Sequence, residues 1–166
     1  MHNSSLKGMQ QNIAAYLGKA TPGTMVLDVG AMDVNGTYRA LFNSKIFKYM
    51  GTDLAAGPNV DLVMKSEFEI PLPDDSVDVV ISGQCFEHCR NPFRLAVEMF
   101  RVCKPGGLCL VVAPREWKEH RHPWDCFRYL ADGMRSILET AGFVVEKAFV
   151  IGIDCWGIGK KAKAAK

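Results

Sequence analysis

The segment from His120 to Asp125 reads His-Arg-His-Pro-Trp-Asp and brings two imidazoles close to one carboxylate. Histidine is the side chain that gains or loses a proton most easily near neutral pH, and a carboxylate can fix the orientation of its ring. We take His120 or His122 as the candidate general base, with Asp125 as the group that orients it. A loop histidine is also often only a solvated hydrogen-bonding group, and that interpretation stays open.

Glu87 and His88 form a second pair of groups that can carry protons. His88 competes with the other two histidines for the role of base. The alternative is structural, because such a pair just before a helix can cap or orient that helix. The nearby aromatic residues also have two interpretations, as an apolar wall for a substrate or as packing of the loop on the sheet. They are Trp117, Trp124, Phe127 and Tyr129.

The same region contains thiol, imidazole and carboxylate groups that can bind metals, namely Cys85, His88, Cys89, His120, His122, Asp125 and Cys126. No pair among them has the tight spacing of a recognised metal motif, so the sequence predicts no metal. The six cysteines also form no CxxC pair, and we expect them to be reduced thiols.

Alternating strands and helices must position these groups. The run from Val77 to Ser82 is typical of a buried parallel strand, and apolar residues recur at helical spacing from Pro92 to Cys103. The segment Lys104 to Gly107 (KPGG) is expected to end that helix as a turn. The predicted strands cover 25–29, 46–52, 61–64, 77–82 and 108–113, and the predicted helices 6–17, 38–42, 92–103 and 131–141.

Two further strands are predicted at 143–150 and 155–158. They lie too close together for a crossover helix, so they should form an antiparallel hairpin. The whole pattern predicts an α/β fold with a doubly wound, mostly parallel, seven-stranded sheet that ends in this hairpin.

Polar and glycine residues gather after the carboxyl ends of the predicted strands. They occupy Asp28 to Gly36, Asp53, Ser66-Glu67, Ser82 to His88 and Pro114 to Asp125. In open α/β sheets ligands bind at this edge. The distribution therefore predicts a binding site there, although loops are polar in general.

Four segments narrow the kind of site. Val26 to Ala31 (VLDVGA) is a strand that runs into a glycine turn, where a ligand can approach the backbone closely. About 20 residues beyond that turn, Asp53 ends the second strand, where a carboxylate can accept hydrogen bonds from both hydroxyls of a ribose. Glu69 to Val80 (EIPLPDDSVDVV) and Arg101 to Leu108 (RVCKPGGL) follow in the chain.

In this order the segments resemble the class I S-adenosylmethionine-dependent methyltransferases, in particular the small methyltransferase type 11-like domains. The resemblance runs from Val26 to about Gly142 and continues through the hairpin to Trp156. Residues 33–36, 87–92 and 120–129 look most like members found in sugar and cell-surface glycan pathways. The resemblance implies an enzyme that uses S-adenosylmethionine to methylate a small-molecule acceptor, such as a sugar or glycan precursor.

The resemblance also implies which residues hold the cofactor. Asp53 would bind the ribose, and Gly83 and Gln84 would line the methionine portion. Ser66 and Glu67 stand where the family commonly places an acidic and a small residue against adenine. The implied cofactor-binding residues are Asp28, Gly30, Ala31, Gly36, Asp53, Leu54, Ser66, Glu67, Ser82, Gly83 and Gln84.

The glycine turn departs from the family pattern and leaves alternatives open. Met32 and Val34 stand where the family usually has its second and third glycines, and Gly36 is expected to take over part of their role. One alternative is a non-catalytic domain that binds S-adenosylmethionine and regulates a partner. The other is a nicotinamide-dependent oxidoreductase, but its G-x-G-x-x-G turn is absent between Gly30 and Gly36.

The composition is that of a globular domain, with 166 residues of which 48% are hydrophobic. We expect a single domain over residues 1–160, with an N-terminal helix inside 1–20 and a Lys/Ala-rich tail at 161–166. No segment has the features of a signal peptide or a membrane span, and a cytoplasmic location is expected.

The formal net charge is +2, but four lysines lie at the C-terminal end, where we expect them to be solvated: Lys160, Lys161, Lys163 and Lys166. Without them 16 basic side chains stand against 18 acidic ones. That balance provides no broad positive surface for nucleic acid. We expect neither a nucleic acid nor a membrane as partner, and the sequence leaves oligomerisation open.

Overall fold

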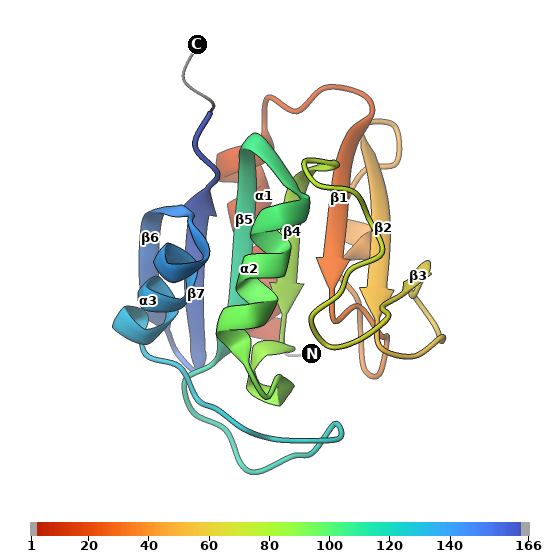
Figure 1. The fold of residues 1–166 in the computed structure, drawn as a ribbon. Coiled ribbons are helices and arrows are strands. Elements are labelled where there is room, and N and C mark those ends of the chain that lie inside the picture. Colours follow the sequence, from red (N-terminus) through yellow and green to blue (C-terminus); the bar gives the residue numbers. More distant parts are fainter. Residues whose placement is uncertain (1–2, 164–166) are drawn as a thin grey trace.

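The computed structural model describes residues 3–163 of the chain. Its strands form a seven-stranded sheet in the order β3-β2-β1-β4-β5-β7-β6 (Figure 1). The strands are β1 (Thr24–Val29), β2 (Phe47–Asp53), β3 (Leu62–Val63), β4 (Val77–Gly83), β5 (Cys103–Pro114), β6 (Val144–Ile151) and β7 (Asp154–Lys160). The helices are α1 (Asn3–Leu17), α2 (Pro92–Val102) and α3 (Ala131–Ala141), with 3₁₀ turns η1 (Arg39–Leu41) and η2 (Phe86–His88).

The strands β3, β2, β1, β4 and β5 run parallel to one another, and β7 runs antiparallel to both β5 and β6. This confirms the predicted α/β fold, with its mostly parallel sheet and its antiparallel C-terminal hairpin. Because β7 is reversed, its first residue, Asp154, pairs with Pro114 at the end of β5. Asp154 therefore lies at the edge where the parallel strands finish.

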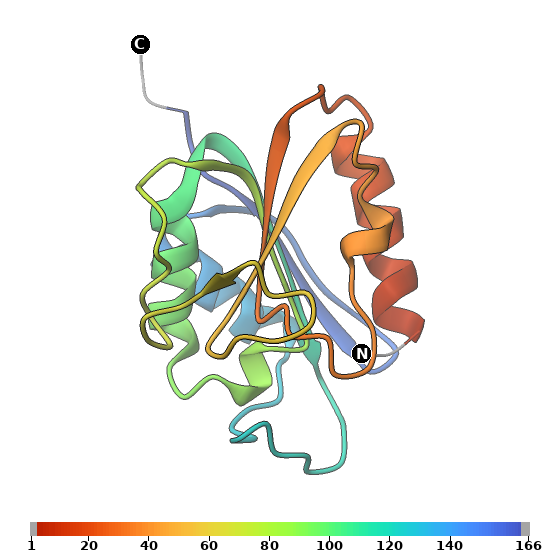
Figure 2. The ribbon, with the colours of Figure 1, turned by 90° about the vertical axis from the view of Figure 1, so that its right-hand side faces the viewer.

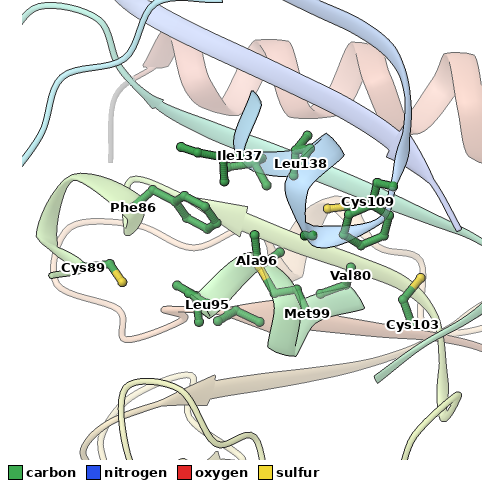
Figure 3. Packing of buried hydrophobic residues seen from close by; sticks show 14 of the residues in the cluster. Val80, Phe86, Cys89, Leu95, Ala96, Met99, Cys103, Cys109, Ile137 and Leu138 are labelled. Carbon is green, nitrogen blue, oxygen red and sulfur yellow. The ribbon is translucent and has the colours of Figure 1, made fainter. Parts of the chain in front are cut away.

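Helices cover both faces of the sheet. Figure 2 shows α1 on one side and α2 with α3 on the other. Successive strand residues point to opposite faces, so Val26 packs with Met9 in the α1 layer while Leu27 packs with Met99 in the α2 layer. The α2 and α3 layer is drawn in Figure 3. Burial on both faces explains why the central strands are apolar without alternation.

Local signals set the ends of two helices. The Asn91 side chain accepts a hydrogen bond from the Arg94 amide (3.1 Å) and caps α2, with Pro92 in the first turn. Gly142 ends α3 in the left-handed conformation, at φ 109°. Since Asn91 supplies the cap, the interpretation of Glu87 and His88 as capping groups for this helix is wrong.

The KPGG segment differs from the prediction. Val77 pairs with Cys103 and Val79 with Leu108, so residues 104–107 bulge out within β5 instead of forming a separate turn. The Gly106 amide donates to the Lys161 carbonyl (2.8 Å), and the Lys161 amide donates to the Gly107 carbonyl (3.0 Å). These long-range bonds hold the segment in the sheet.

The lysine-rich end is also more ordered than expected. Lys160 is the last residue of β7 and pairs with Glu146, and Lys161 Nζ donates to the Asp75 carboxylate (2.7 Å) and the Phe100 carbonyl (2.9 Å). The expectation of a solvated end is therefore wrong for Lys161, while the Lys160 side chain remains exposed. Met1, His2 and residues 164–166, with Lys166, lie outside the described residues. Within residues 3–163 no helix combines the length and apolar character needed to cross a membrane.

Candidate functional site

A cavity of about 650 Å³ lies at the carboxyl ends of β1, β2 and β4. Its walls come from the turn after β1, the end of β2, the segment after β4 and the long loop between β5 and α3. That loop extends beyond the sheet edge in Figure 1. Most of the predicted site residues line this cavity: Asp28, Gly30, Ala31, Gly36, Asp53, Leu54, Glu67, Gly83, Gln84, His88, His120 and His122.

Three predicted site residues are not among the lining residues. Ser82 is buried, and its hydroxyl donates to the Val29 carbonyl (2.8 Å), which ties β4 to β1. Ser66 accepts a hydrogen bond from the Phe68 amide (3.3 Å) in a small turn. Asp125 lies behind the histidines. The structure thus gives these residues supporting contacts and no direct exposure to the cavity.

The glycine turn and Asp53 meet as the sequence predicts. Gly30 has φ 79°, and a Cβ there would lie 2.4 Å from Cys85 Sγ, so the turn needs glycine to pack against the segment after β4. The Asp53 carboxylate accepts hydrogen bonds from the Met32 amide (2.9 Å) and the Leu54 amide (2.7 Å). A carboxylate offers about four acceptor positions, so Asp53 retains capacity for a ligand.

Met32 and Val34, which replace two family glycines, fit the turn in different ways. The side chain of Met32 packs over Gly57, where a Cβ would lie 2.4 Å from Met32 Sδ. Val34 is mostly exposed at 62%. Gly36 adopts φ 123°, and its amide donates to Asp33 Oδ1 (2.8 Å). The turn therefore keeps left-handed glycines at Gly30 and Gly36 and places side chains between them.

Asp28 is a buried carboxylate on the cavity wall. Its Oδ2 accepts a hydrogen bond from the Tyr49 hydroxyl, and its Oδ1 has no partner among the described residues. Burial raises the pKa of Asp28 to about 7. An unpaired buried oxygen that lines a cavity suits a cationic or hydrogen-bond-donating ligand group.

Asp28→Asn tests this burial through the pH dependence of stability. Folding favours the protonated acid because the pKa rises from 3.8 to about 7, so the free energy of unfolding falls as pH rises between these values. The asparagine variant lacks this titration. Relative to the variant, the natural protein should lose about 2 kcal/mol between pH 5 and pH 8 in urea denaturation. Parallel stability profiles would contradict the assignment.

Glu87 anchors the long loop to the end of β4. Its carbonyl accepts hydrogen bonds from the Cys126 amide (2.7 Å) and the Phe127 amide (3.2 Å). The side chain is fully buried, and neither carboxylate oxygen has a hydrogen-bond partner among the described residues. Burial raises the pKa of Glu87 to about 8. His88 lies beside it, with Nε2 3.7 Å from Glu87 Oε1, and desolvation lowers the pKa of His88.

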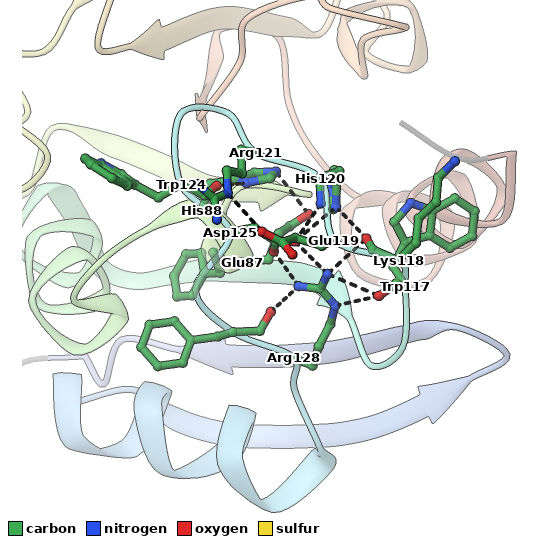
Figure 4. Close-up of polar contacts among 12 residues, drawn as sticks. Glu87, His88, Trp117, Lys118, Glu119, His120, Arg121, Trp124, Asp125 and Arg128 are labelled. Atoms are coloured by element: carbon green, nitrogen blue, oxygen red, sulfur yellow. Dashed lines mark hydrogen bonds and ion pairs between the residues drawn. The ribbon is translucent and has the colours of Figure 1, made fainter.

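Asp125 and Arg128 fix the loop from behind, as Figure 4 shows. Arg128 donates to both Asp125 oxygens, at 2.5 and 2.8 Å, and this pairing lowers the pKa of Asp125. Asp125 Oδ2 also accepts a hydrogen bond from the His120 amide (2.7 Å) and lies 3.6 Å from His120 Nδ1. Asp125 is thus held ionised and fixes the backbone at His120.

The aromatic residues take different places relative to the cavity. Trp117 and Trp124 line the cavity. Phe127 is exposed and is not a lining residue. Tyr129 is buried, and its hydroxyl donates to the Phe86 carbonyl (2.7 Å), so it packs the loop on the sheet.

The first turn of α1 reaches the cavity wall. Ser4 Oγ donates to Asp154 Oδ2 (2.7 Å), and Asp154 Oδ1 accepts a hydrogen bond from Gln84 Nε2 (2.9 Å). The hydroxyls of Ser5 and Tyr38 form a second, short hydrogen bond. Gln84 and Tyr38 both line the cavity, so two chains of hydrogen bonds join α1 to it.

Sequence reasoning missed several lining residues. Glu87 belongs to the predicted edge segment Ser82 to His88, but it is not among the predicted site residues, although it lines the cavity. Tyr38 was read as part of an apolar helix. It lies against the end of β4, where a Cβ at Gly83 would be 2.2 Å from the Tyr38 hydroxyl. No spacing rule connects Tyr38 to that strand, because the contact is made across the sheet.

A family model described as a methyltransferase domain matches residues 24–111. The chain belongs to this methyltransferase domain family. Membership confirms the predicted methyltransferase family. Among the alternatives left open by the sequence, it favours a methyltransferase over an oxidoreductase.

Two curated relatives of this methyltransferase domain are mycobacterial proteins. A probable S-adenosylmethionine-dependent methyltransferase of Mycolicibacterium smegmatis is 39% identical over 95 residues, which cover 54% of this chain and 37% of the relative. An uncharacterized methyltransferase of Mycolicibacterium paratuberculosis is 35% identical over 105 residues, covering 57% of this chain and 40% of the relative. The matched segment therefore spans well under half the length of these relatives.

Solved structures share the fold of this methyltransferase domain. A SAM-dependent methyltransferase from Aquifex aeolicus superposes with a TM-score of 0.66 at 22% identity, covering 96% of this chain and 98% of that one. The 1,6-didemethyltoxoflavin-N1-methyltransferase of Burkholderia thailandensis, with bound S-adenosylhomocysteine, gives a TM-score of 0.75 at 15% identity, covering 96% and 79%. At these identities the likeness describes architecture.

Proposed function

We propose that this domain binds S-adenosylmethionine in the cavity and transfers the methyl group to a hydroxyl oxygen of a small acceptor, such as a sugar or glycan precursor. The observation that carries the proposal is a single cavity lined both by Asp53 with its glycine turn and by the imidazoles of His88, His120 and His122. Residues proposed to bind a nucleoside and residues that can accept a proton thus line the same cavity. We also propose that residues 1–160 act as one domain.

The residues present fit the cofactor. A volume of about 650 Å³ lies inside the range of roughly 300–1,000 Å³ that small-ligand sites occupy. Asp53 has spare acceptor positions for two ribose hydroxyls, and Asp28 offers an unpaired oxygen. Gln84 holds a left-handed backbone with φ 57°, an uncommon state for a residue with a side chain and one that clusters at functional sites.

Each of these residues has a proposed place. Asp53 holds the ribose, and Gly83 with Gln84 lines the methionine portion. Glu67 borders the adenine side, where Arg90 pairs with it at 2.7 Å. Asp28 faces the polar end of the ligand.

When bound, S-adenosylmethionine supplies an electrophilic methyl group. The protein must hold the acceptor oxygen in line behind it and remove a proton from that oxygen. His120 and His122 are the proposed candidates for the base, and Asp125 holds their segment through the His120 amide. Trp117 and Trp124 offer apolar surface that excludes water and can stack on the ring of a sugar.

Calorimetric titration with S-adenosylmethionine, S-adenosylhomocysteine and NAD tests the ligand. The two adenosyl compounds should bind and NAD should not. Asp53→Ala should weaken S-adenosylmethionine binding by about 1–3 kcal/mol, because it removes charge-assisted hydrogen bonds to the ribose. Asp78→Ala is the matched control, since Asp78 also accepts a hydrogen bond from a backbone amide, that of Met25 (2.8 Å), but lies outside the cavity. Unchanged affinity in Asp53→Ala would remove this residue from the site.

Methyl transfer itself is tested by incubating the protein with methyl-labelled cofactor and a panel of sugars, sugar nucleotides and glycan precursors. Label should appear in a hydroxyl-bearing acceptor as a methyl ether. Tight cofactor binding without transfer to any acceptor in the panel would count against this proposal and in favour of the regulatory domain.

A further inference from the structure

We infer that Glu87, His88 and His120 form a binding site for one divalent transition-metal ion, such as zinc or manganese(II). Each residue offers one ligand atom, and these atoms lie within 4.8 Å of one another. All three residues line the cavity. Two imidazoles and one carboxylate are a donor set that such ions accept. The sequence predicted no metal because the ligands come from two segments that lie far apart in the chain.

The backbone already orients both imidazoles for this role. His88 Nδ1 lies 2.6 Å from the Trp124 carbonyl oxygen, and His120 Nδ1 lies 3.2 Å from the Lys118 carbonyl oxygen. A carbonyl can only accept, so each Nδ1 carries the proton and donates it. Each Nε2 is then left with a free lone pair. Metal-binding histidines are commonly held by this kind of outer hydrogen bond.

Glu87 supplies the negative charge when the ion displaces the proton that burial favours on its carboxyl group. Its side chain is fully buried, and neither oxygen has a hydrogen-bond partner among the described residues. A buried carboxylate without partners is costly, and a cation removes that cost. Glu87 Oε1 lies 3.7 Å from His88 Nε2, so the carboxylate and one lone pair already face the same point. Figure 4 shows Glu87, His88 and His120 grouped beside the Asp125–Arg128 pair.

Little movement would complete the site. Metal–ligand bonds of about 2.0–2.2 Å in a tetrahedral arrangement put ligand atoms about 3.3 Å apart. The present separations of 3.7 Å and at most 4.8 Å close to that value by small side-chain rotations. Three protein ligands leave at least one coordination position open.

The open coordination position gives the metal a role in methyl transfer, and this step rests on the proposed function. A metal held by three residues of the cavity wall can bind an oxygen of the acceptor and fix it in line with the methyl group. His88 and His120 would then be occupied as ligands. His122, which lines the same cavity but is outside the ligand set, would remain as the base.

The test uses the full chain, stripped with EDTA and kept free of S-adenosylmethionine. Calorimetric titration with zinc chloride or manganese(II) chloride should give one ion per chain, and cobalt(II) should develop visible absorption bands. Glu87→Gln, His88→Gln and His120→Gln should each weaken binding by at least about 10- to 100-fold. His122→Gln is the matched control and should change metal affinity by less than about threefold. Thermal unfolding in EDTA verifies that each variant is folded.

Three results would overturn the site: no binding tighter than millimolar, full affinity in His120→Gln, or equal weakening in His122→Gln. Acetohydroxamate, a ligand with two oxygens, should shift the cobalt(II) bands, and an unchanged spectrum would overturn the open position. Since these measurements involve no S-adenosylmethionine, their failure leaves the proposed methyl transfer untouched. Failure of cofactor binding would equally leave the metal result standing.

Discussion

Replacing His122 with glutamine is expected to lower the rate of methyl transfer by about 100- to 10,000-fold, which is the usual contribution of a general base. His122 lines the cavity, and its ring centre lies 5.5 Å from that of His88 and 6.2 Å from that of His120. The amide of glutamine keeps polarity and approximate size but cannot accept a proton near neutral pH. The affinity for S-adenosylmethionine should stay within about twofold, because Asp53 and the glycine turn are untouched.

The measurement is single-turnover methyl transfer with saturating acceptor, paired with cofactor titration. Glu116→Gln is the control, since it also replaces a side chain of the same loop but at an exposed position that does not line the cavity. Loss of rate in both variants would point to general disturbance of the loop. Normal turnover in His122→Gln would discard this residue as the base.

Trp156→Ala is expected to reduce the free energy of unfolding by about 3–5 kcal/mol, the usual range for truncating a large buried aromatic residue. Trp156 lies on β7, is 2% exposed, and belongs to the core layer beneath α1. Its ring fills the space beside Gly8, where a Cβ would lie 2.3 Å from Trp156 Cζ2. Gly8 on α1 therefore leaves room for the Trp156 indole. Removal of the indole leaves a cavity between α1 and the sheet.

Urea denaturation at fixed pH measures this loss in the free energy of unfolding. Val144→Ala, on the neighbouring strand β6, is the control, because Val144 is 60% exposed and its truncation should cost less than about 1 kcal/mol. Similar losses in the two variants would contradict the view that the α1 layer depends on Trp156.

The sheet was predictable because each central strand is buried on both faces and therefore consists mainly of apolar residues. The bounds of α3 follow from local signals, since Gly142 ends the helix where the apolar periodicity stops. The KPGG segment was not predictable in the same way. Its local chemistry favours a turn, but the hydrogen bonds between Gly106, Gly107 and Lys161 hold it in the sheet. Contacts between residues so far apart in the chain produce no local sequence pattern that could predict them.

The site shows the same division. Topology alone brings the ends of parallel strands to one edge, which is why Gly30 and Asp53 could be placed together. The burial and the hydrogen-bond partners of a side chain cannot be predicted in this way, because they depend on the packing of the whole chain. Ser82 is predicted to bind the cofactor, but its hydroxyl donates to the Val29 carbonyl. Glu87 is not predicted as a site residue, but its buried carboxylate lines the cavity and has no hydrogen-bond partner among residues 3–163. The residue types indicated where the candidate site lies. The packing of the chain decided which side chains can contact a ligand there.

Because β7 runs in the reverse direction, Asp154 lies at the sheet edge beside the cavity and within reach of α1. Asp154 accepts hydrogen bonds from both Ser4 and Gln84, and Ser5 bonds to Tyr38, so the amino end of α1 is linked to two residues that line the cavity. Detaching that helix would release both at once. Detachment of α1 should therefore weaken the binding of a ligand in the cavity, and a ligand bound there should in turn stabilise the docked helix.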